Sequence, residues 1–272
     1  MEKYSVLMSL YAKEKPEYLR LSIDSMINQT VKPDEIVIVK DGPLTKELEE
    51  VLNYYTVEYS DLIKIVISEE NIGLGRALNL GLKNCKNELV ARMDTDDISL
   101  PERCEKQLKY YENHKDLDVL GTMVDEFYDN PNEVISSRIV PTEHEKIYEF
   151  AKKRSPFNHP TVMYKKTSVL ECGGYSDLRR NQDVDLFGRM LFKGNIAANI
   201  NESLLLFRSN KDLSKRRRSW ENTKSYIATI NSLRKIGFSS NKDYLIVVIG
   251  QTVMFICPLK VQGLLYKLFL RK

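Results

Sequence analysis

The chain has 272 residues, of which 42% are hydrophobic and 29% are charged, and its formal net charge is +3. These proportions are typical of a globular protein with a substantial core, and they exclude a mainly disordered chain. The length allows one large domain, or one domain with an appendage.

The charge is distributed unevenly along the chain. Residues 211–272 contain 13 Lys and Arg against 3 Asp and Glu, a net charge of +10, which leaves −7 on residues 1–210. A mildly acidic body with a basic tail indicates that the tail meets phosphate, either in lipid headgroups or in nucleic acid.

The four cysteines form no C-x-x-C pair, and the three histidines add no ligand cluster. We interpret the cysteines as reduced thiols in a cytoplasmic protein. We also expect no secretory signal at the N-terminus, because its apolar run is short and soon reaches Lys13, Glu14 and Lys15.

Strands and helices alternate through the first hundred residues. Short apolar runs predict strands over residues 4–10, 35–39, 62–67 and 88–93. Helices are expected from Pro16, over residues 44–55 and 76–84, and again from Pro101. This alternation predicts βαβ units and an α/β fold with a mostly parallel sheet flanked by helices.

Polar residues lie at or just after the ends of these strands. Parallel strands present their C-terminal ends at one edge of the sheet, where α/β proteins bind ligands. We therefore expect one rim to gather Ser9, Tyr11, Asp41, Arg76, Asp94, Asp96 and Asp97. This convergence is stronger evidence for a ligand site than any single motif.

After residue 114 the pattern changes. Strands are predicted over residues 118–128, 133–140 and 161–165, and partly over 196–208. A short helix is broken at Cys172–Tyr175, and residues 183–192 are predicted to be helical. We expect this half to complete the sheet and to build the wall that faces the first half.

The fourth predicted strand ends in three carboxylates, those of Asp94, Asp96 and Asp97. Carboxylates so close repel one another unless a cation or hydrogen-bond donors compensate. Hard oxygen ligands suit Mg²⁺ or Mn²⁺, so the cluster predicts a divalent-metal site that holds a nucleotide diphosphate. The alternative is helix capping, in which Asp97 or Ser99 caps the helix expected from Pro101.

Three other rim residues each allow two interpretations. Asp41 can accept a hydrogen bond from the N–H of a base, or it can belong to an ordinary turn. Tyr11 can stack on a base or pack on the rim. Arg76 can pair with a phosphate or remain a solvated helix residue.

Asp183 and Asp185 lie at the start of a predicted helix, where the helix dipole favours carboxylates. One of them is also a candidate general base, because a carboxylate can take the proton of a substrate hydroxyl. His159 is a candidate for a substrate pocket, with a structural histidine as the alternative. Arg180 and Gln182 are further pocket candidates.

Six motifs spread over about residues 4–208 resemble the inverting family 2 glycosyltransferases, which have the GT-A fold. Within that family the chain is similar to bacterial enzymes of capsule, exopolysaccharide or O-antigen assembly. Each motif alone is weak, but six in the family's order are specific. They are Ser5–Tyr11, Ile36–Gly42, Asn71–Asn79, Met93–Asp97, Gly173–Tyr175 and Gln182–Leu186.

The resemblance implies a role for each matching position. It implies that Asp94 to Asp97 bind the donor and the metal, with Asp96 and Asp97 nearest the diphosphate. It implies that Asp183 is the base, which leaves Asp185 structural. Contacts to the donor nucleotide are implied for Ser9, Tyr11, Asp41 and Arg76.

Two positions depart from the family pattern. The family often has two acidic residues where this chain has Lys40–Asp41. Position 182 is Gln where many members carry Glu, although Gln is common in the polysaccharide branch.

The tail contains a basic segment followed by two apolar ones. In enzymes of this fold a segment like the one around Lys215–Arg218 closes over the donor diphosphate, and a solvated linker is the alternative. Tyr244–Cys257 is strongly apolar but shorter than the roughly 20 residues that span a bilayer. With Val261–Leu270 and their basic flanks, it predicts helices that lie in the membrane surface or, alternatively, pack on the catalytic domain.

We therefore predict a GT-A catalytic domain over residues 1–210 and a basic, helical C-terminal extension over 211–272. The predicted enzyme is a metal-dependent hexosyl- or N-acetylhexosaminyltransferase. Its donor is a nucleotide sugar, with UDP expected, and its acceptor is a glycan linked to a polyprenyl diphosphate. It is expected in the cytoplasm on the inner face of the cell membrane, without a nucleic-acid partner.

Two other classes compete with this prediction. A strand that ends in Asp-x-Asp also opens the phosphatases that use an aspartyl nucleophile, but those usually place it near the N-terminus and have Thr or Val where this chain has Ile98. The second is a non-catalytic subunit that keeps the fold without turnover, against which the retained Asp positions argue.

Overall fold

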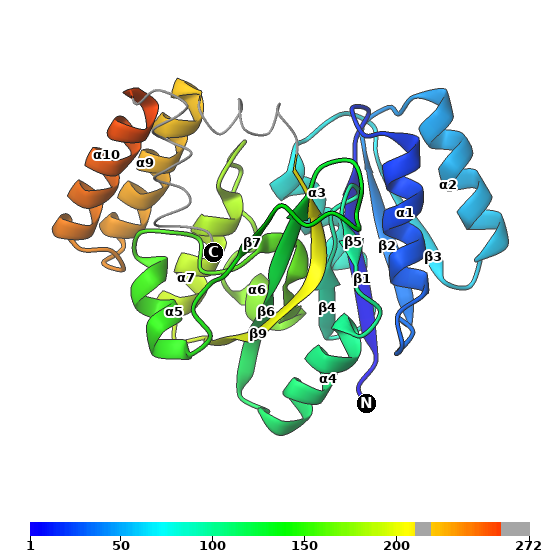
Figure 1. Ribbon diagram of the computed structural model, residues 1–272, viewed down its shortest axis with the longest axis horizontal. Coiled ribbons are helices and arrows are strands. Elements are labelled where there is room, and N and C mark those ends of the chain that lie inside the picture. The colour runs from blue at the N-terminus through cyan, green and yellow to red at the C-terminus, as the bar shows by residue number, and fades with distance from the viewer. Residues whose placement is uncertain (210–218, 257–272) are drawn as a thin grey trace.

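The computed structural model describes residues 1–209 and 219–256. A central sheet has helices on both sides, and helices α9 (Trp220–Lys235) and α10 (Asn241–Ile256) lie side by side at one end (Figure 1). The described strands form a nine-stranded sheet in the order β3-β2-β1-β4-β8-β6-β9-β5, with β7 paired to β6. The expected α/β architecture with flanking helices is confirmed.

The N-terminal half is a parallel sheet, as the alternation predicts. Its strands are β1 (Tyr4–Leu10), β2 (Glu35–Asp41), β3 (Ile63–Ser68) and β4 (Leu89–Arg92), and neighbouring strands among them run in parallel. The connecting helices are α1 (Pro16–Ile27), α2 (Lys46–Glu58) and α3 (Leu74–Asn84). Helix α2 begins later than expected because Thr45 caps it, accepting a hydrogen bond from the N–H of Leu48.

The second half adds strands of both directions. Strand β8 runs antiparallel to both β4 and β6, while β9 runs parallel to β6 and antiparallel to β5. The elements are β5 (Ile98–Ser99), α4 (Arg103–Asn113), β6 (Leu117–Phe127), β7 (Ser136–Arg138), α5 (His144–Ala151), the 3₁₀ turn η1 (His159–Thr161), β8 (Met163–Lys165), α6 (Lys166–Glu171), α7 (Gln182–Phe192) and β9 (Ile196–Arg208).

Several predicted bounds are wrong. The strand expected over residues 133–140 is limited to 136–138, and helix α5 was not predicted. Helix α4 begins at Arg103 rather than Pro101, because the carbonyl of Pro101 is engaged by the N–H of Thr30 at 2.9 Å. Helix α9 was not predicted either, although it lies within the predicted helical extension.

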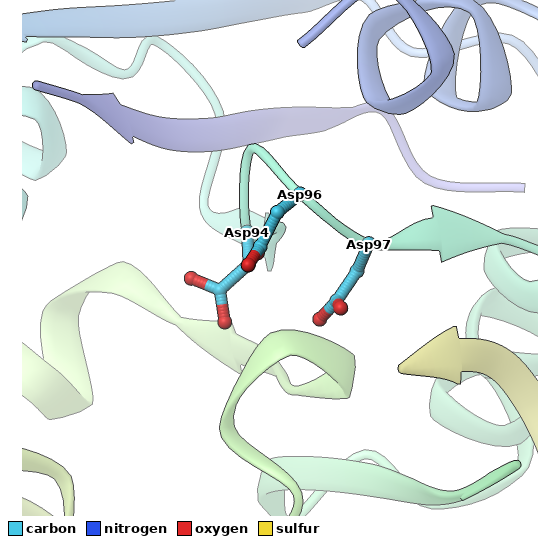
Figure 2. A group of neighbouring side chains, drawn as sticks. All are labelled: Asp94, Asp96 and Asp97. Carbon is cyan, nitrogen blue, oxygen red and sulfur yellow. The ribbon is translucent and has the colours of Figure 1, made fainter. Parts of the chain in front are cut away.

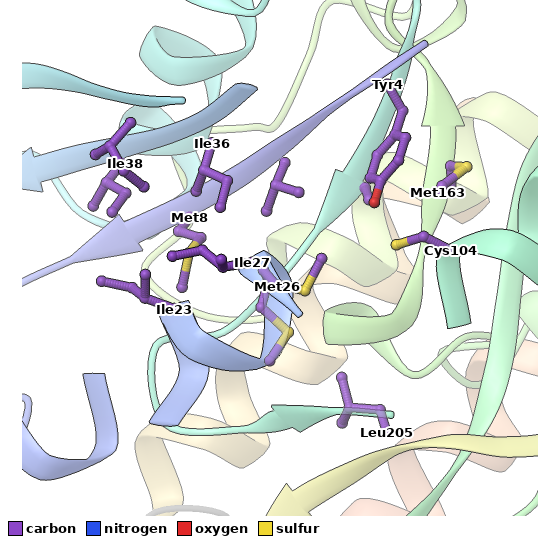
Figure 3. Packing of buried hydrophobic residues seen from close by; sticks show 14 of the residues in the cluster. Tyr4, Met8, Ile23, Met26, Ile27, Ile36, Ile38, Cys104, Met163 and Leu205 are labelled. Atoms are coloured by element: carbon purple, nitrogen blue, oxygen red, sulfur yellow. The ribbon is translucent and has the colours of Figure 1, made fainter. Parts of the chain in front are cut away.

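The two faces of the sheet bury separate apolar clusters. On one face Met8, Ile36 and Ile38 pack against Ile23 and Ile27 of α1 (Figure 3). On the other face the alternate strand residues, including Leu7 and Val39, pack against α3 and α7. The strand side chains alternate between faces, and this explains why each strand is apolar along its whole length.

Helix α9 packs against α7 through Leu233, which is fully buried beside Gly188. Helix α10 packs on α9 and leaves much of its own apolar surface exposed, including Leu245, Ile249 and Ile256. Within residues 1–209 and 219–256, no helix is both long enough and apolar enough to cross a membrane. The predicted segments Lys215–Arg218 and Val261–Leu270 lie outside the described residues.

Three of the four cysteines, Cys85, Cys104 and Cys172, are free and buried. Cys257 lies outside the described part of the chain. Burial raises the pKa of the Cys85 thiol to about 12, so this thiol is uncharged and inert near neutral pH.

Candidate active site

The turn after β4 carries Asp94, Asp96 and Asp97, whose carboxylates project to the same side (Figure 2). One oxygen from each carboxylate lies within 4.8 Å of the others. The turn forms at the C-terminal end of β4, so the cluster lies on the rim where the sequence predicts it.

Arg92 contacts this cluster and was not among the predicted site residues. Its side chain is 1% exposed and forms an ion pair with the carboxylate of Asp94. A buried guanidinium is stable only beside an anion or strong acceptors, so Arg92 fixes the position of Asp94. A single arginine within the apolar run Leu89–Met93 is the sequence signal that could have identified it.

Strand β9 holds the rest of this turn through Arg208, which contacts the carboxylate of Asp97 and the backbone of Asp96. The backbone N–H of Arg208 donates to Oδ1 of Asp97 at 2.8 Å, and its Nε donates to the carbonyl of Asp96 at 2.9 Å. The Arg208 guanidinium lies over the rings of Tyr18 and Phe127, at 3.8 and 4.5 Å from their centroids. Arg208 therefore ties the acidic turn to the end of the sheet.

This geometry contradicts helix capping as the reason for Asp97 or Ser99. Helix α4 begins at Arg103, and Glu102 occupies its N-cap position. Asp97 is fully buried and is turned toward β9 instead.

The carboxylates of the acidic cluster lie close together and repel one another. Burial, reinforced by the charges of Asp94 and Glu14, raises the pKa of Asp96 to about 7. Burial and the neighbouring carboxylates likewise raise the pKa of Asp97 well above its ordinary range. Among the described residues, Oδ2 of Asp97 is buried without a hydrogen-bond partner. Carboxylate oxygens in such a cluster fit Mg²⁺ or Mn²⁺, and metal ligation by Asp96 and Asp97 stays a prediction.

Glu14 adds a fourth carboxylate, which no sequence motif predicted. Its Oε2 accepts a hydrogen bond from the Thr95 hydroxyl at 2.9 Å. Burial raises its pKa, hydrogen bonds from Lys15 and Thr95 oppose the rise, and the charge of Asp94 adds to it. The loop after β1 thus contacts the acidic turn.

A pocket of about 170 Å³ connects the acidic turn with α7. It brings Asp94, His159 and Asp183 together, three of the residues selected from the sequence. The pocket is lined by Asp94, Val124, Glu126, Arg138, Asn158, His159, Pro160, Asp183 and Phe207.

Asp183 lies in the first turn of α7 and accepts a hydrogen bond from the Ser155 hydroxyl at 3.3 Å. Burial raises the pKa of the Asp183 carboxyl, although backbone N–H groups and the charge of Arg138 oppose the rise. Asp185 instead pairs with Arg189 at 2.8 Å. The two carboxylates therefore differ in environment, with Asp183 open to the pocket and Asp185 bound within the helix.

His159 stands at the pocket as a neutral imidazole. Its Nε2 lies 2.9 Å from the hydroxyl of Tyr175. Burial, followed by the charge of Arg92, lowers the pKa of His159 well below its ordinary value. His159 can therefore donate or accept a hydrogen bond, but it carries no positive charge near neutral pH.

The far wall of the pocket comes from β6 and β7 and was not predicted. Nη1 of Arg138 donates to Oδ1 of Asn158 at 2.9 Å, and the Ser136 hydroxyl donates to the buried carboxylate of Glu126 at 2.6 Å. These residues belong to no motif, and only the fold brings them to the pocket.

Asp41 stabilises a turn, which is one of the two interpretations given for it above. Its carboxylate accepts hydrogen bonds from the N–H groups of Ile72 and Gly73 at 2.7 and 3.2 Å, and from the Asn71 amide at 3.1 Å. Burial raises its pKa. Asp41 thereby holds the loop that begins α3, and its contact with a base stays a prediction.

The remaining candidates lie outside the pocket lining. Arg76 forms an exposed ion pair with Asp177, Ser9 is half-buried on β1, and Tyr11 is 37% exposed after it. Arg180 donates to the hydroxyl of Ser219 at 3.0 Å, toward the start of α9. Gln182 is buried at the start of α7. The nucleotide and pocket roles of these five stay predictions.

Curated relatives match nearly the whole chain. It is 37% identical over 269 residues to the amylovoran biosynthesis glycosyltransferase AmsE of Erwinia amylovora, covering 97% of this chain and 98% of the relative. It is 34% identical over 270 residues to the Escherichia coli UDP-Gal:alpha-D-GlcNAc-diphosphoundecaprenol beta-1,3-galactosyltransferase, covering 99% and 97%.

Solved glycosyltransferases share the GT-A fold. Staphylococcus aureus TarS 1–349 in complex with UDP-GlcNAc aligns with a TM-score of 0.68 at 18% identity, covering 98% of this chain and 76% of that one. The Pyrobaculum calidifontis mannosyltransferase PcManGT, in complex with GDP-Man and Mn²⁺, aligns with a TM-score of 0.66 at 14% identity, covering 98% and 79%. The model of glycosyl transferase family 2 matches residues 5–178, and the chain belongs to that family.

Proposed function

We propose that this glycosyltransferase inverts the anomeric centre and that Asp183 is its general base. The pocket supports this proposal, because it places Asp183 and the acidic turn on the walls of one cavity. Inversion by a single displacement needs the base and the leaving group on opposite faces of the sugar, with room between them.

The proposed donor is a UDP-hexose or UDP-N-acetylhexosamine. The acceptor is a hydroxyl of a glycan on a polyprenyl diphosphate. The name of the E. coli relative specifies a UDP-sugar donor and a diphosphoundecaprenol acceptor, and one solved structure of this fold contains UDP-GlcNAc. By the same similarity, the product belongs to a bacterial surface polysaccharide.

In the proposed reaction the Asp183 carboxylate takes the proton of the acceptor hydroxyl. The freed oxygen forms a bond to the anomeric carbon while the bond from that carbon to the diphosphate oxygen breaks, which releases UDP. A divalent cation held by Asp96 and Asp97 would neutralise the charge on the diphosphate. Arg92 keeps Asp94 oriented at the same wall.

We further propose that the enzyme works on the cytoplasmic face of the membrane, where α10 contacts the lipid surface. The exposed apolar side chains of α10 and the basic tail support this location, since an apolar face with basic flanks favours an anionic bilayer. The lipid-linked acceptor would then approach from the same surface.

The Asp183→Asn variant tests the assignment of the base. We expect it to lose transfer by at least about 100-fold, because general base catalysis contributes that much, while donor binding stays near wild type. Transfer is measured with radiolabelled nucleotide sugars, and binding by thermal shift with and without Mn²⁺.

Asp61→Asn is the matched control, because Asp61 is exposed outside the site, and it should leave both measurements unchanged. Substantial transfer by Asp183→Asn would refute the base. Donor binding by the wild-type chain without transfer to any acceptor would instead indicate a non-catalytic subunit.

A further inference from the structure

The turn that leads into α7 has an unusual backbone conformation. Asn181 has φ 60° and ψ 22°, and it is the one residue other than glycine with positive φ in the described part of the chain. Asparagine tolerates this left-handed conformation better than other non-glycine residues, but surrounding contacts must hold it. Asp183 follows two residues later, so the conformation of Asn181 sets where its carboxylate points.

The contacts that hold this turn come from α9. Nδ2 of Asn181 donates to the Ser225 hydroxyl at 3.1 Å, and that hydroxyl lies 3.4 Å from the carbonyl of Arg180, to which it donates. Nη1 of Arg180 donates to the hydroxyl of Ser219 at 3.0 Å, and Ser219 is the N-cap of α9. Side chains from the first two turns of α9 therefore hold both residues before Gln182.

Helix α9 also contacts the other side of Asp183. The Tyr226 hydroxyl donates to the carbonyl of Lys153 at 3.2 Å. Lys153 lies two residues before Ser155, whose hydroxyl donates to Asp183. Tyr226 is close enough for the charge of Asp183 to add to the burial that raises the Tyr226 pKa. Two neighbouring residues of α9 thus contact two separate segments that flank one carboxylate.

Tight packing fixes α9 in this position. A Cβ on Gly188 of α7 would lie 2.6 Å from Cδ1 of Leu233, which is fully buried. The two helices are therefore in direct contact along α7, and a shift of α9 would strain the turn at Asn181.

We propose that α9 acts as a brace that positions the catalytic base, with Ser225 and Asn181 as positioning residues that do not touch substrate. This inference rests on the proposed role of Asp183. It assigns the C-terminal extension a part in the reaction, because the helix adjoining α10 then governs the geometry of proton removal.

The Ser225→Ala variant tests the brace. We expect kcat to fall about five- to tenfold, because small displacements of a catalytic group are costly, while KM for the donor stays within about twofold. The thermal midpoint should stay near wild type, and Ser225→Thr, which keeps the hydroxyl, should restore kcat. The matched control is Ser232→Ala on the same helix, whose exposed hydroxyl donates to the carbonyl of Ala228 at 3.2 Å.

A double-mutant cycle with Asn181→Gly separates positioning from general packing. Glycine accepts the left-handed conformation but lacks the amide, so Asn181→Gly should lower kcat by about the same factor as Ser225→Ala. The double variant should show no further loss if both act through one hydrogen bond. Independent, multiplicative losses, or wild-type kcat in Ser225→Ala, would overturn the brace.

Failure of the brace can be told from failure of the proposed function. If Asp183→Asn is inactive and Ser225→Ala is fully active, the base stands and the brace is refuted. If Asp183→Asn keeps wild-type transfer, the base itself is refuted, and with it any positioning role for α9.

Discussion

The three carboxylates of the acidic turn differ in what compensates their charge. Asp94 has the buried guanidinium of Arg92, whereas burial and neighbouring carboxylates raise the pKa of both Asp96 and Asp97. Buried carboxylates with raised pKa values lower the stability of the free protein, and such groups are common at functional sites.

Asp96→Asn should stabilise the metal-free protein at pH 8. The folded-state pKa of Asp96 is about 7, above its ordinary value, so its ionisation opposes folding as pH rises through that range. Removing the charge is expected to raise the free energy of unfolding by about 2 kcal/mol. Urea denaturation measures the gain, and Mn²⁺ should stabilise the wild type but not the variant.

Asp94→Asn is the informative comparison, because it leaves the Arg92 charge buried without its anion. We expect a loss of about 3 kcal/mol at the same pH. Equal effects of the two variants would contradict the distinction between a compensated and an uncompensated carboxylate.

The pH dependence of kcat should report the environment of Asp183. Burial raises its pKa, and the base acts only when ionised, so activity should fall on acidification at a pH above the ordinary aspartate range of about 4. The measurement is kcat against pH at saturating donor and Mn²⁺. An acidic limb at or below that range would contradict the assignment.

The sequence was sufficient to select these carboxylates as candidates but not the groups that hold them. Asp94, Asp96, Asp97 and Asp183 stand in recognisable local patterns. Arg208 lies 111 residues from Asp97 along the chain, and the contact depends on β9 pairing with β5. Such long-range contacts leave no local periodicity, so they appear only once the fold is known.

At the scale of elements, the approach of α3 to the sheet depends on Gly81. A Cβ there would lie 2.6 Å from Cγ2 of Val39 and would also clash with Leu7, both of them buried. Gly81→Ala is therefore expected to destabilise the fold by about 1–3 kcal/mol, measured by thermal denaturation.

Gly250→Ala is the matched control for this substitution. Nothing lies within 4 Å of a Cβ built on Gly250 in α10, so alanine should stabilise that helix by about 0.5–1 kcal/mol. Destabilisation by both substitutions would show that steric crowding does not explain the effect at Gly81.

The elements that sequence reasoning found and missed differ in how they bury apolar surface. Strands β1, β2 and β4 are buried on both faces, so each gives a continuous apolar run. Helix α5 buries only Ile147 and Ala151, and α9 buries two threonines besides Ile230 and Leu233. Their apolar stripes are too weak to separate a helix from a loop.

At the scale of the whole molecule, α10 and α2 lie at opposite ends (Figure 1). Ile249 is 56% exposed on α10, and we expect the purified chain to bind vesicles that contain anionic lipid. Ile249→Glu should weaken this binding by about tenfold in a co-sedimentation assay, because a charged group disfavours burial in the interface.

Val57→Glu provides the control, since Val57 on α2 is 81% exposed at the far end of the molecule. It should leave vesicle binding unchanged. Equal losses from both variants would indicate an effect of net charge alone, and no binding by the wild type would refute membrane contact through α10.

The hydrogen bond between Arg208 and Asp97 has a consequence for folding during synthesis. During synthesis the acidic turn emerges long before β9, so the Asp97 carboxylate lacks this donor until residue 208 has left the ribosome. The complete hydrogen bonding of the acidic turn is thus a late feature of folding. Incomplete chains that end before β9 would lack this hydrogen bonding, and we expect them to gain no stability from nucleotide or metal.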